Sequence, residues 1–251
     1  MSDNNKAKLV TWPQVLSVLK AIQRAVLYGP PGTGKSRAAF KSLAKEEPWF
    51  SLTMTEDTPA AELRGHFVPS GPGEFAWLDG PCLRWWDQGG LLVLNEIDKA
   101  SADALSFLFA VLDPPDQAAV TLPTGDMQKP NLEVKFPHRV IATMNGIPED
   151  LPEALRSRLG AQLFIAAPAP EAFKTLPKKY QQVAENMFKG CSARDFEHVV
   201  RQVGFRGWEN FVTLVENLPG ALKDKEQLAC KVVWGPDGAA VFDALRLASE
   251  E

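Results

Sequence analysis

Short apolar runs recur along the chain up to about residue 166, separated by stretches with helical spacing or by polar loops. Five of these runs suit buried strands, namely residues 25–28, 49–54, 90–94, 139–144 and 161–166. The segment 12–23 instead places Val15, Leu16, Leu19 and Ile22 on one side of a helix. Because strands that alternate with helices build parallel sheets, the pattern predicts an α/β fold with a parallel five-stranded sheet flanked by helices.

The alternation stops at the sequence Pro168-Ala169-Pro170, where two prolines interrupt regular structure. Beyond this point the apolar positions follow a helical period. We therefore expect two domains, an α/β domain over residues 1–167 and a small, mostly helical domain over residues 168–251.

Two segments exceed what a minimal α/β domain needs. Residues 66–81 indicate a β-hairpin that turns at 70–73. In the second segment, the β-prone runs 120–122 and 132–136 flank polar turns at 124–126 and 129–131, which suggests another hairpin. Such inserts are either surface decoration or the places where a shared core carries its particular function.

Composition and charge narrow the function classes. The net charge of −4 disfavours a general nucleic-acid-binding surface. No apolar run reaches membrane-spanning length, and the polar start lacks a signal-peptide core, so we expect a cytoplasmic protein. The three cysteines and three histidines form no metal-binding spacing, which favours core or surface thiols over a metal site.

The most specific motif is a complete phosphate loop, G-x-x-x-x-G-K-[ST], between the strand 25–28 and a helical stretch at 37–47. Its glycines let backbone N–H groups curl around a triphosphate, Lys35 should reach the β- and γ-phosphates, and the Ser36 hydroxyl should bind Mg²⁺. The expected nucleotide-binding residues are Gly29, Pro30, Pro31, Gly32, Thr33, Gly34, Lys35 and Ser36.

A second chemical element follows the apolar strand 90–94, which ends in Asn95 and Glu96. Opposite a phosphate loop, such a pair supports the metal and polarises the attacking water. Asn95 offers an amide oxygen without negative charge, so it would support Mg²⁺ more weakly than a carboxylate, whereas Glu96 is the expected general base. The alternative is a cap for the helix predicted near 101–112.

Two further elements lie near the next strand ends. Asn145 follows the strand 139–144 and could contact the γ-phosphate or position water, although Asn-Gly is also a plain turn signal. Arg156 and Arg158 precede the last strand, where they are either solvated surface charges or a catalytic arginine supplied to a neighbouring subunit.

Together these motifs resemble the AAA+ ATPases, and within them the MoxR-like and the dynein- and midasin-related group, over roughly residues 10–168. The resemblance rests on residues 29–36, 91–96, Asn145 and 155–159, and on the stretches 62–69 and 77–81. It implies ATP with Mg²⁺, a homo-oligomeric and commonly hexameric ring, and Arg158, with Arg156 as the alternative, acting across the subunit interface. It also implies that Arg194, in Ser192-Ala-Arg194-Asp, contacts the nucleotide from the C-terminal domain.

The same resemblance implies remodelling or activation of a client or adaptor protein, in some relatives one that bears a von Willebrand A-type domain. We therefore expect an ATP-hydrolysing remodelling module. Two alternatives stay open: an ATP-binding scaffold in which Asn95 makes hydrolysis negligible, and a DNA-directed motor or loader, which the acidic balance disfavours. The pair Trp85-Trp86 could mark an interaction patch, but core packing is the better interpretation.

Overall fold

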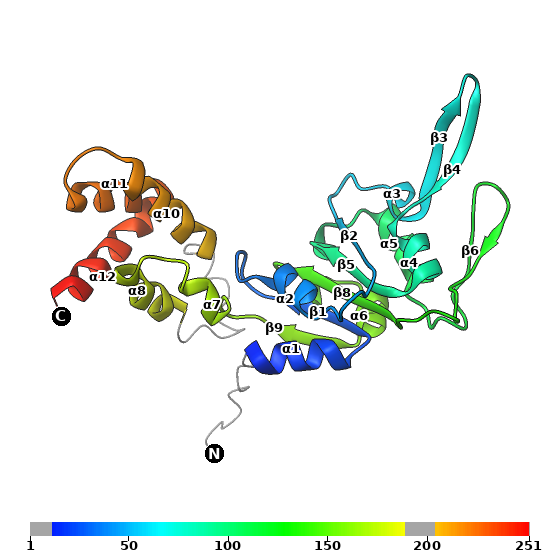
Figure 1. Ribbon diagram of the computed structural model, residues 1–251, viewed down its shortest axis with the longest axis horizontal. Coiled ribbons are helices and arrows are strands. Elements are labelled where there is room, and N and C mark those ends of the chain that lie inside the picture. Colours follow the sequence, from blue (N-terminus) through cyan, green and yellow to red (C-terminus); the bar gives the residue numbers. More distant parts are fainter. Residues whose placement is uncertain (1–11, 189–203, 251) are drawn as a thin grey trace, which may run out of the picture. The chain divides into compact units, whose positions relative to one another are not determined.

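The computed structural model describes residues 12–188 and 204–250 (Figure 1). Contacts divide this part of the chain into two compact units. We call them the sheet unit, with residues 12–28 and 35–163, and the helical unit, with residues 29–34, 164–188 and 204–250. Among the described residues, no helix has the length and apolar character needed to span a bilayer.

The sheet has five parallel strands in the order β2-β5-β8-β1-β9, so the predicted fold class is confirmed. The strands are β1 (Arg24–Tyr28), β2 (Trp49–Thr53), β5 (Gly90–Asn95), β8 (His138–Met144) and β9 (Ala161–Phe164). Their bounds lie within one or two residues of those expected from the apolar runs. Because β5 and β8 are neighbours, the residues that follow them lie at one edge of the sheet.

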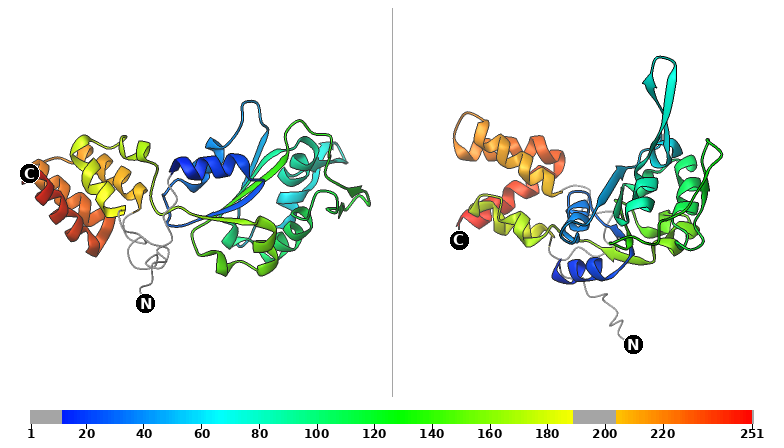
Figure 2. Two further views of the ribbon diagram at one scale, coloured as in Figure 1. Left: turned by 90° about the horizontal axis from the view of Figure 1, so that it is seen from below. Right: turned by 45° about the vertical axis from the view of Figure 1, so that its right-hand side comes forward.

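Helices cover both faces of the sheet. They are α1 (Trp12–Ala21), α2 (Lys35–Lys41), α3 (Ala60–Arg64), α4 (Pro81–Gln88), α5 (Ala102–Val111) and α6 (Glu153–Leu159). Side chains alternate along each strand, so Leu92 and Leu94 face the core cluster with α3 to α6, while Leu91 and Val93 face the other side. Figure 2 shows α1 and α6 on opposite sides of the sheet.

Trp85 and Trp86 of α4 are core residues. Both side chains are only 2% exposed and pack in the cluster formed with β5 and α5. The indole N–H of Trp85 donates to the Gly90 carbonyl at 2.9 Å, so its polar atom is satisfied inside the core. Core packing, rather than an interaction patch, therefore accounts for this pair.

The first insert is the expected hairpin. Strand β3 (Gly65–Gly71) pairs antiparallel with β4 (Glu74–Asp79), and the hairpin projects from between α3 and α4 (Figure 1). Phe67 and Trp77 lie opposite each other and meet edge to face, with ring centroids 5.3 Å apart. Phe67 and Phe75 are exposed, so this hairpin offers aromatic surface to solvent.

The second insert is a shorter hairpin than the sequence pattern predicts. Strand β6 (Val120–Thr121) pairs with β7 (Met127–Gln128), and residues 132–136 form no strand, so that assignment was wrong. Pro130 lacks an N–H for a strand ladder, and the Asn131 side chain accepts from Glu133 N in a local turn. Asn131 also donates to the carbonyls of Trp86 and Asp87, which ties this stretch to α4.

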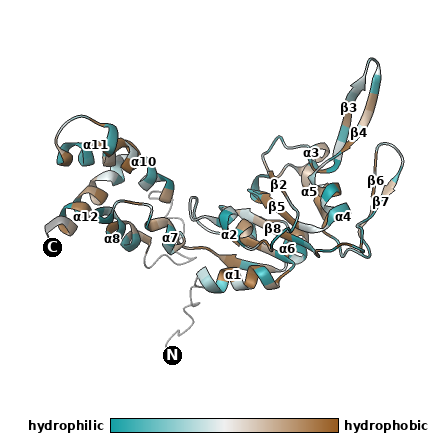
Figure 3. Ribbon diagram, in the orientation of Figure 1, coloured by the Kyte–Doolittle hydropathy of each residue, from teal (hydrophilic) through white to brown (hydrophobic). Residues whose placement is uncertain are grey.

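The helical unit confirms the mostly helical C-terminal region. Its helices are α7 (Pro170–Phe173), α8 (Lys178–Phe188), α10 (Phe205–Asn217), α11 (Leu222–Trp234) and α12 (Gly238–Glu250). Apolar stretches alternate with polar ones along them (Figure 3), and aromatic rings such as Trp208, Phe211 and Trp234 form the centre of their core. The boundary at residues 167/168 stays a prediction.

Candidate functional site

The phosphate loop has the backbone that the motif predicts. Gly29, Gly32 and Gly34 have φ values of 141°, 77° and 84°, a region that side-chain-bearing residues rarely occupy. A Cβ at Gly29 would lie 2.4 Å from the Ile165 carbonyl oxygen, so only glycine fits there. The buried Thr33 hydroxyl donates to the Pro30 carbonyl at 3.0 Å and closes the turn. The loop is therefore shaped in advance of any ligand.

Lys35 and Ser36, at the start of α2, meet the ends of two neighbouring strands. The Lys35 ammonium donates to Asn145 Oδ1 at 2.9 Å, just past β8. The Ser36 hydroxyl donates to Asn95 Oδ1 at 2.5 Å, at the end of β5. The structure thus brings together four residues that the sequence analysis assigned to one site. Lys35 is only 6% exposed, which strengthens the field of its charge.

Asn95 is held by hydroxyl groups. Its Oδ1 also accepts from Thr143 Oγ1 at 3.2 Å, and its Nδ2 donates to Ser51 Oγ at 3.2 Å. Sequence reasoning missed Thr143 and Ser51. The signal that could have found them is a hydroxyl residue close to the carboxyl end of an otherwise apolar strand.

The cap interpretation of Asn95 does not hold. The N-cap of α5 is Ser101, whose hydroxyl oxygen accepts from the Ala104 N–H at 3.1 Å. The side chain of Asn95 contacts the start of α2 and the neighbouring strands instead. Asn145 lies in a bend, as its turn interpretation expects, and its Oδ1 accepts from Lys35. Its contact with a γ-phosphate or a water stays a prediction.

Glu96 has an unusual backbone. Its φ and ψ of 53° and 46° are left-handed, a conformation that costs an ordinary residue about 1–2 kcal/mol. Its N–H donates to Thr143 Oγ1 at 3.4 Å, and its side chain is exposed. The strand therefore turns sharply after Asn95 and leaves the Glu96 carboxylate open to solvent at this edge of the sheet.

The two candidate arginines of α6 have different surroundings. Arg158 forms an ion pair with Asp113, with its Nη2 at 2.7 Å and its Nε at 2.9 Å from Oδ1, and it also donates to the Ala154 carbonyl. Its guanidinium lies over the Phe109 ring. The buried Nε of Arg156 has no hydrogen-bond partner. Arg158 is thus held by Asp113 of the same chain rather than by the residues around Lys35.

Arg24 fixes the segment that presents Asp113. Its guanidinium donates to the carbonyls of Leu112 and Asp113, the latter at 2.9 Å. Burial lowers the pKa of Arg24, while the Asp113 carboxylate opposes this shift and Arg158 adds to it. The end of α5 is therefore anchored to β1, and Asp113 is held where it can bind Arg158.

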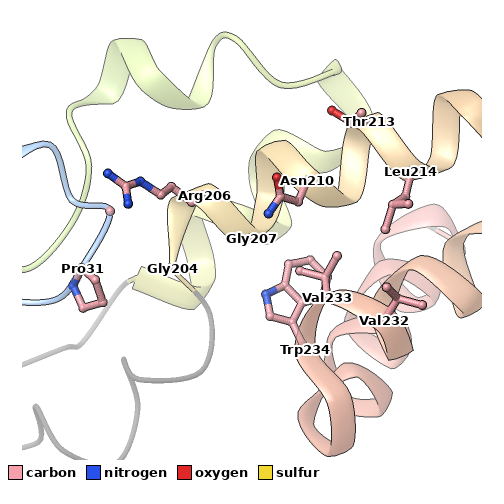
Figure 4. Close-up of a pocket in the computed structure, with 11 residues that line it drawn as sticks. Pro31, Gly204, Arg206, Gly207, Asn210, Thr213, Leu214, Val232, Val233 and Trp234 are labelled. Atoms are coloured by element: carbon pink, nitrogen blue, oxygen red, sulfur yellow. The ribbon is translucent and has the colours of Figure 1, made fainter.

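A cavity of about 600 Å³ lies within the helical unit (Figure 4). Pro31 and Gly32 of the phosphate loop line it together with Arg206 and Asn210 of α10 and Trp234 of α11. Arg194, the predicted nucleotide contact, lies outside the described residues, whereas Arg206 was missed. The signal was Gly204-Phe205-Arg206-Gly207, an arginine between glycines at a helix start.

The donor set around Ser36 fits Mg²⁺ in chemistry, because that ion prefers oxygen ligands and the Ser36 hydroxyl and Asn95 Oδ1 lie together. Neither group carries charge. In the part of the chain that the structure describes, no three His, Cys, Asp or Glu side chains gather as a metal site. A cation here would therefore depend on the charge of a bound phosphate group.

Comparison with known proteins agrees with these motifs. The chain is 32% identical over 89 residues to the denitrification regulatory protein NirQ of Pseudomonas aeruginosa, covering 35% of this chain and 34% of NirQ. It is 31% identical over 103 residues to midasin of Giardia intestinalis, covering 40% of this chain and 2% of midasin. The matches thus span about a third of NirQ and a small fraction of midasin.

The fold also resembles that of NtrX from Brucella abortus, solved in complex with ATP, with a TM-score of 0.53 and 14% identity over 99% of this chain and 69% of that one. The family model of the AAA domain (dynein-related subfamily) matches residues 24–159, more than half of the chain. The resemblance carried by the motifs is therefore confirmed, and the chain belongs to the dynein-related subfamily of the AAA domain family.

Proposed function

We propose that this chain binds ATP with Mg²⁺ and hydrolyses it, as the subunit of a homo-oligomeric ring that remodels or activates a partner protein. The observation that carries the proposal is the pair of contacts from Lys35 to Asn145 and from Ser36 to Asn95, at adjacent strand ends, made by the two residues that directly follow Gly34 of the phosphate loop in the chain. Membership of the AAA domain family supports ATP as the ligand.

Each residue has a distinct role in this proposal. Lys35 pairs with the β- and γ-phosphates and exchanges its contact with Asn145 for the nucleotide. Ser36 and Asn95 would hold Mg²⁺, which neutralises phosphate charge when it is bound. Glu96 accepts the proton of the attacking water, and Asn145 orients that water or the γ-phosphate. Glu96 suits this role because its carboxylate is exposed at the same strand end.

Two arginines complete the proposed site. Arg158 acts on the nucleotide of a neighbouring subunit, because its own contacts hold it at Asp113, away from Lys35. Arg206 adds a cation from the first turn of α10, since it lines the same cavity as the loop residues Pro31 and Gly32. Arg194 keeps its predicted role as a second candidate, and Arg156 remains the alternative to Arg158.

A second candidate function is a nucleotide-locked scaffold. The observation that favours it is Asn95, which brings no charge to the metal position. In that case nucleotide would hold the ring together without turnover. A separate protein, such as one with a von Willebrand A-type domain, is the proposed partner in either case, and the net charge of −4 argues against nucleic acid. We also place the protein in the cytoplasm.

The test is steady-state ATP hydrolysis with Mg²⁺ over a range of protein concentrations, for the wild type, Glu96→Gln and Lys35→Ala. We expect a rate per subunit that rises with concentration, a loss of turnover with retained ATP binding in Glu96→Gln, and a loss of binding in Lys35→Ala. A Glu96→Gln variant that hydrolyses ATP at the parent rate would refute the base assignment. Tight binding with negligible wild-type turnover would favour the scaffold.

A further inference from the structure

The side chain of Asn95 has two unlike ends, and only one of them suits a cation. The amide oxygen accepts hydrogen bonds and can face Mg²⁺ or its water shell, whereas the amide nitrogen donates and repels a cation. Aspartate would present an oxygen either way. An asparagine at this position therefore needs something that fixes which end faces Ser36.

The hydrogen-bond network around Asn95 determines its orientation. Ser36 and Thr143 both direct their hydroxyl hydrogens to Oδ1, at 2.5 and 3.2 Å. Thr143 Oγ1 in turn accepts from the Glu96 N–H. With the amide reversed, both hydroxyls would face N–H donors, and their own hydrogens would lose this shared acceptor. The arrangement is complete only if Nδ2 has an acceptor on its other side.

Ser51 supplies that acceptor. It lies on β2 and pairs with Val93, two residues before Asn95 on β5, so the Ser51 and Asn95 side chains share one face of the sheet. The distance from Asn95 Nδ2 to Ser51 Oγ is 3.2 Å, and Ser51 is half-buried. Thr53 stands directly across from Asn95, but its side chain is exposed.

We propose that Ser51 is a positioning residue that locks the Asn95 amide with Oδ1 toward Ser36. The Ser36 hydroxyl then donates its hydrogen to Asn95, and its oxygen lone pairs stay available for Mg²⁺. This inference rests on the proposed nucleotide function and deepens it, because it explains how an asparagine works where a carboxylate is usual. Without the Ser51 hydroxyl, a partly buried amide N–H loses its acceptor in the orientation that favours the cation.

The experiment measures equilibrium binding of a fluorescent ATP analogue to the full chain, once in excess Mg²⁺ and once in EDTA. The dissociation constant in EDTA divided by that in Mg²⁺ reports the metal-dependent part of binding and requires no turnover. We expect Ser51→Ala to reduce this ratio by up to about tenfold, the effect of one lost hydrogen bond in a partly buried site. Ser51→Thr, which keeps the hydroxyl, should stay near the wild-type ratio.

A double-mutant cycle separates positioning from a general structural effect. In the Asn95→Asp background both carboxylate oxygens are acceptors, so Ser51→Ala should change the ratio by less than about twofold. Thr53→Val, which removes a hydroxyl from the same strand, is the matched control and should leave the ratio unchanged. An equal loss from Ser51→Ala in both backgrounds would overturn the positioning role.

The remaining outcomes distinguish this inference from the proposed function. A wild-type ratio above one that Ser51→Ala does not alter would overturn the role of Ser51 and leave the nucleotide site standing. A wild-type ratio of one would overturn the proposed Mg²⁺ site. No nucleotide binding at all would overturn the proposed nucleotide function. In both cases the role of Ser51 would be overturned as well.

Discussion

Arg139 and Glu47 form a buried ion pair whose removal should destabilise the sheet unit strongly. Their side chains are only 7% and 2% exposed. Arg139 Nη1 donates to both Glu47 oxygens, at 2.8 and 3.0 Å, while Nη2 donates to the Leu19 carbonyl and Ser42 Oγ. Glu47 also accepts from Ala44 N. One guanidinium thus joins α1, the turn after α2 and the start of β8.

The expected loss in the free energy of unfolding depends on which charge stays buried without its partner. Arg139→Met leaves the Glu47 carboxylate buried with the Ala44 N–H as its remaining partner among these contacts, and Glu47→Gln leaves a buried guanidinium without its counter-charge. Each change should lower the free energy of unfolding by about 3–5 kcal/mol. The double variant keeps no buried charge, so it should be more stable than Arg139→Met alone, with a coupling of about 2 kcal/mol.

Because the chain has two compact units, whole-chain unfolding would mix their transitions. Hydrogen exchange followed by mass spectrometry, on peptides that cover β1 and β8, measures the sheet unit by itself. Glu46→Gln is the matched control, since its ion pair with Lys135 is exposed at both ends and should contribute less than about 1 kcal/mol. Additive effects of the two core substitutions would refute the reasoning.

Two further predictions concern pH and the subunit interface. Burial, and less strongly the charge of Arg24, lowers the pKa of His138. Because the unfolded chain then binds a proton at a higher pH than the folded one, the fold should be fully stable above the ordinary pKa of about 6.5 and should lose stability as pH falls through 6.5 toward the lowered value. Hydrogen exchange between about pH 7.5 and 5, on peptides that cover β8 and corrected for the intrinsic pH dependence of exchange, should show this loss of stability in the wild type and less of it in His138→Phe. Equal losses in the two proteins would contradict the prediction. Arg158→Ala should retain ATP binding but lose turnover. Mixing this variant with Glu96→Gln subunits should restore part of the ATP hydrolysis. A mixture as inactive as its components would leave no support for action across the interface.

The sequence predicted the features that depend on local pattern. Strands with continuous apolar runs, such as β5 and β8, could be located to within a residue or two because burial on both faces fixes their composition. The phosphate loop was visible because its glycines satisfy a local backbone requirement. The first hairpin was visible for the same reason, through the glycines and proline of its turn.

Features that depend on contacts between distant segments were not predictable in the same way. Ser51 and Thr143 are ordinary strand residues until the sheet order places them beside Asn95. The second arm of the second hairpin was misassigned because residues 132–136 have strand-like composition, yet Asn131 ties the chain to α4 instead. The partner of Arg158 could not be read from its own helix, because Asp113 lies at the end of α5.

The placement of the second hairpin has a mechanical consequence. The loop that carries β6 and β7 begins next to Asp113, the partner of Arg158, and leads through the anchored Asn131 into β8, whose far end precedes Asn145. If Arg158 serves a neighbouring subunit, the two ends of this loop belong to two different nucleotide sites. A force on the exposed Met127 would then be transmitted along the backbone to both of these ends.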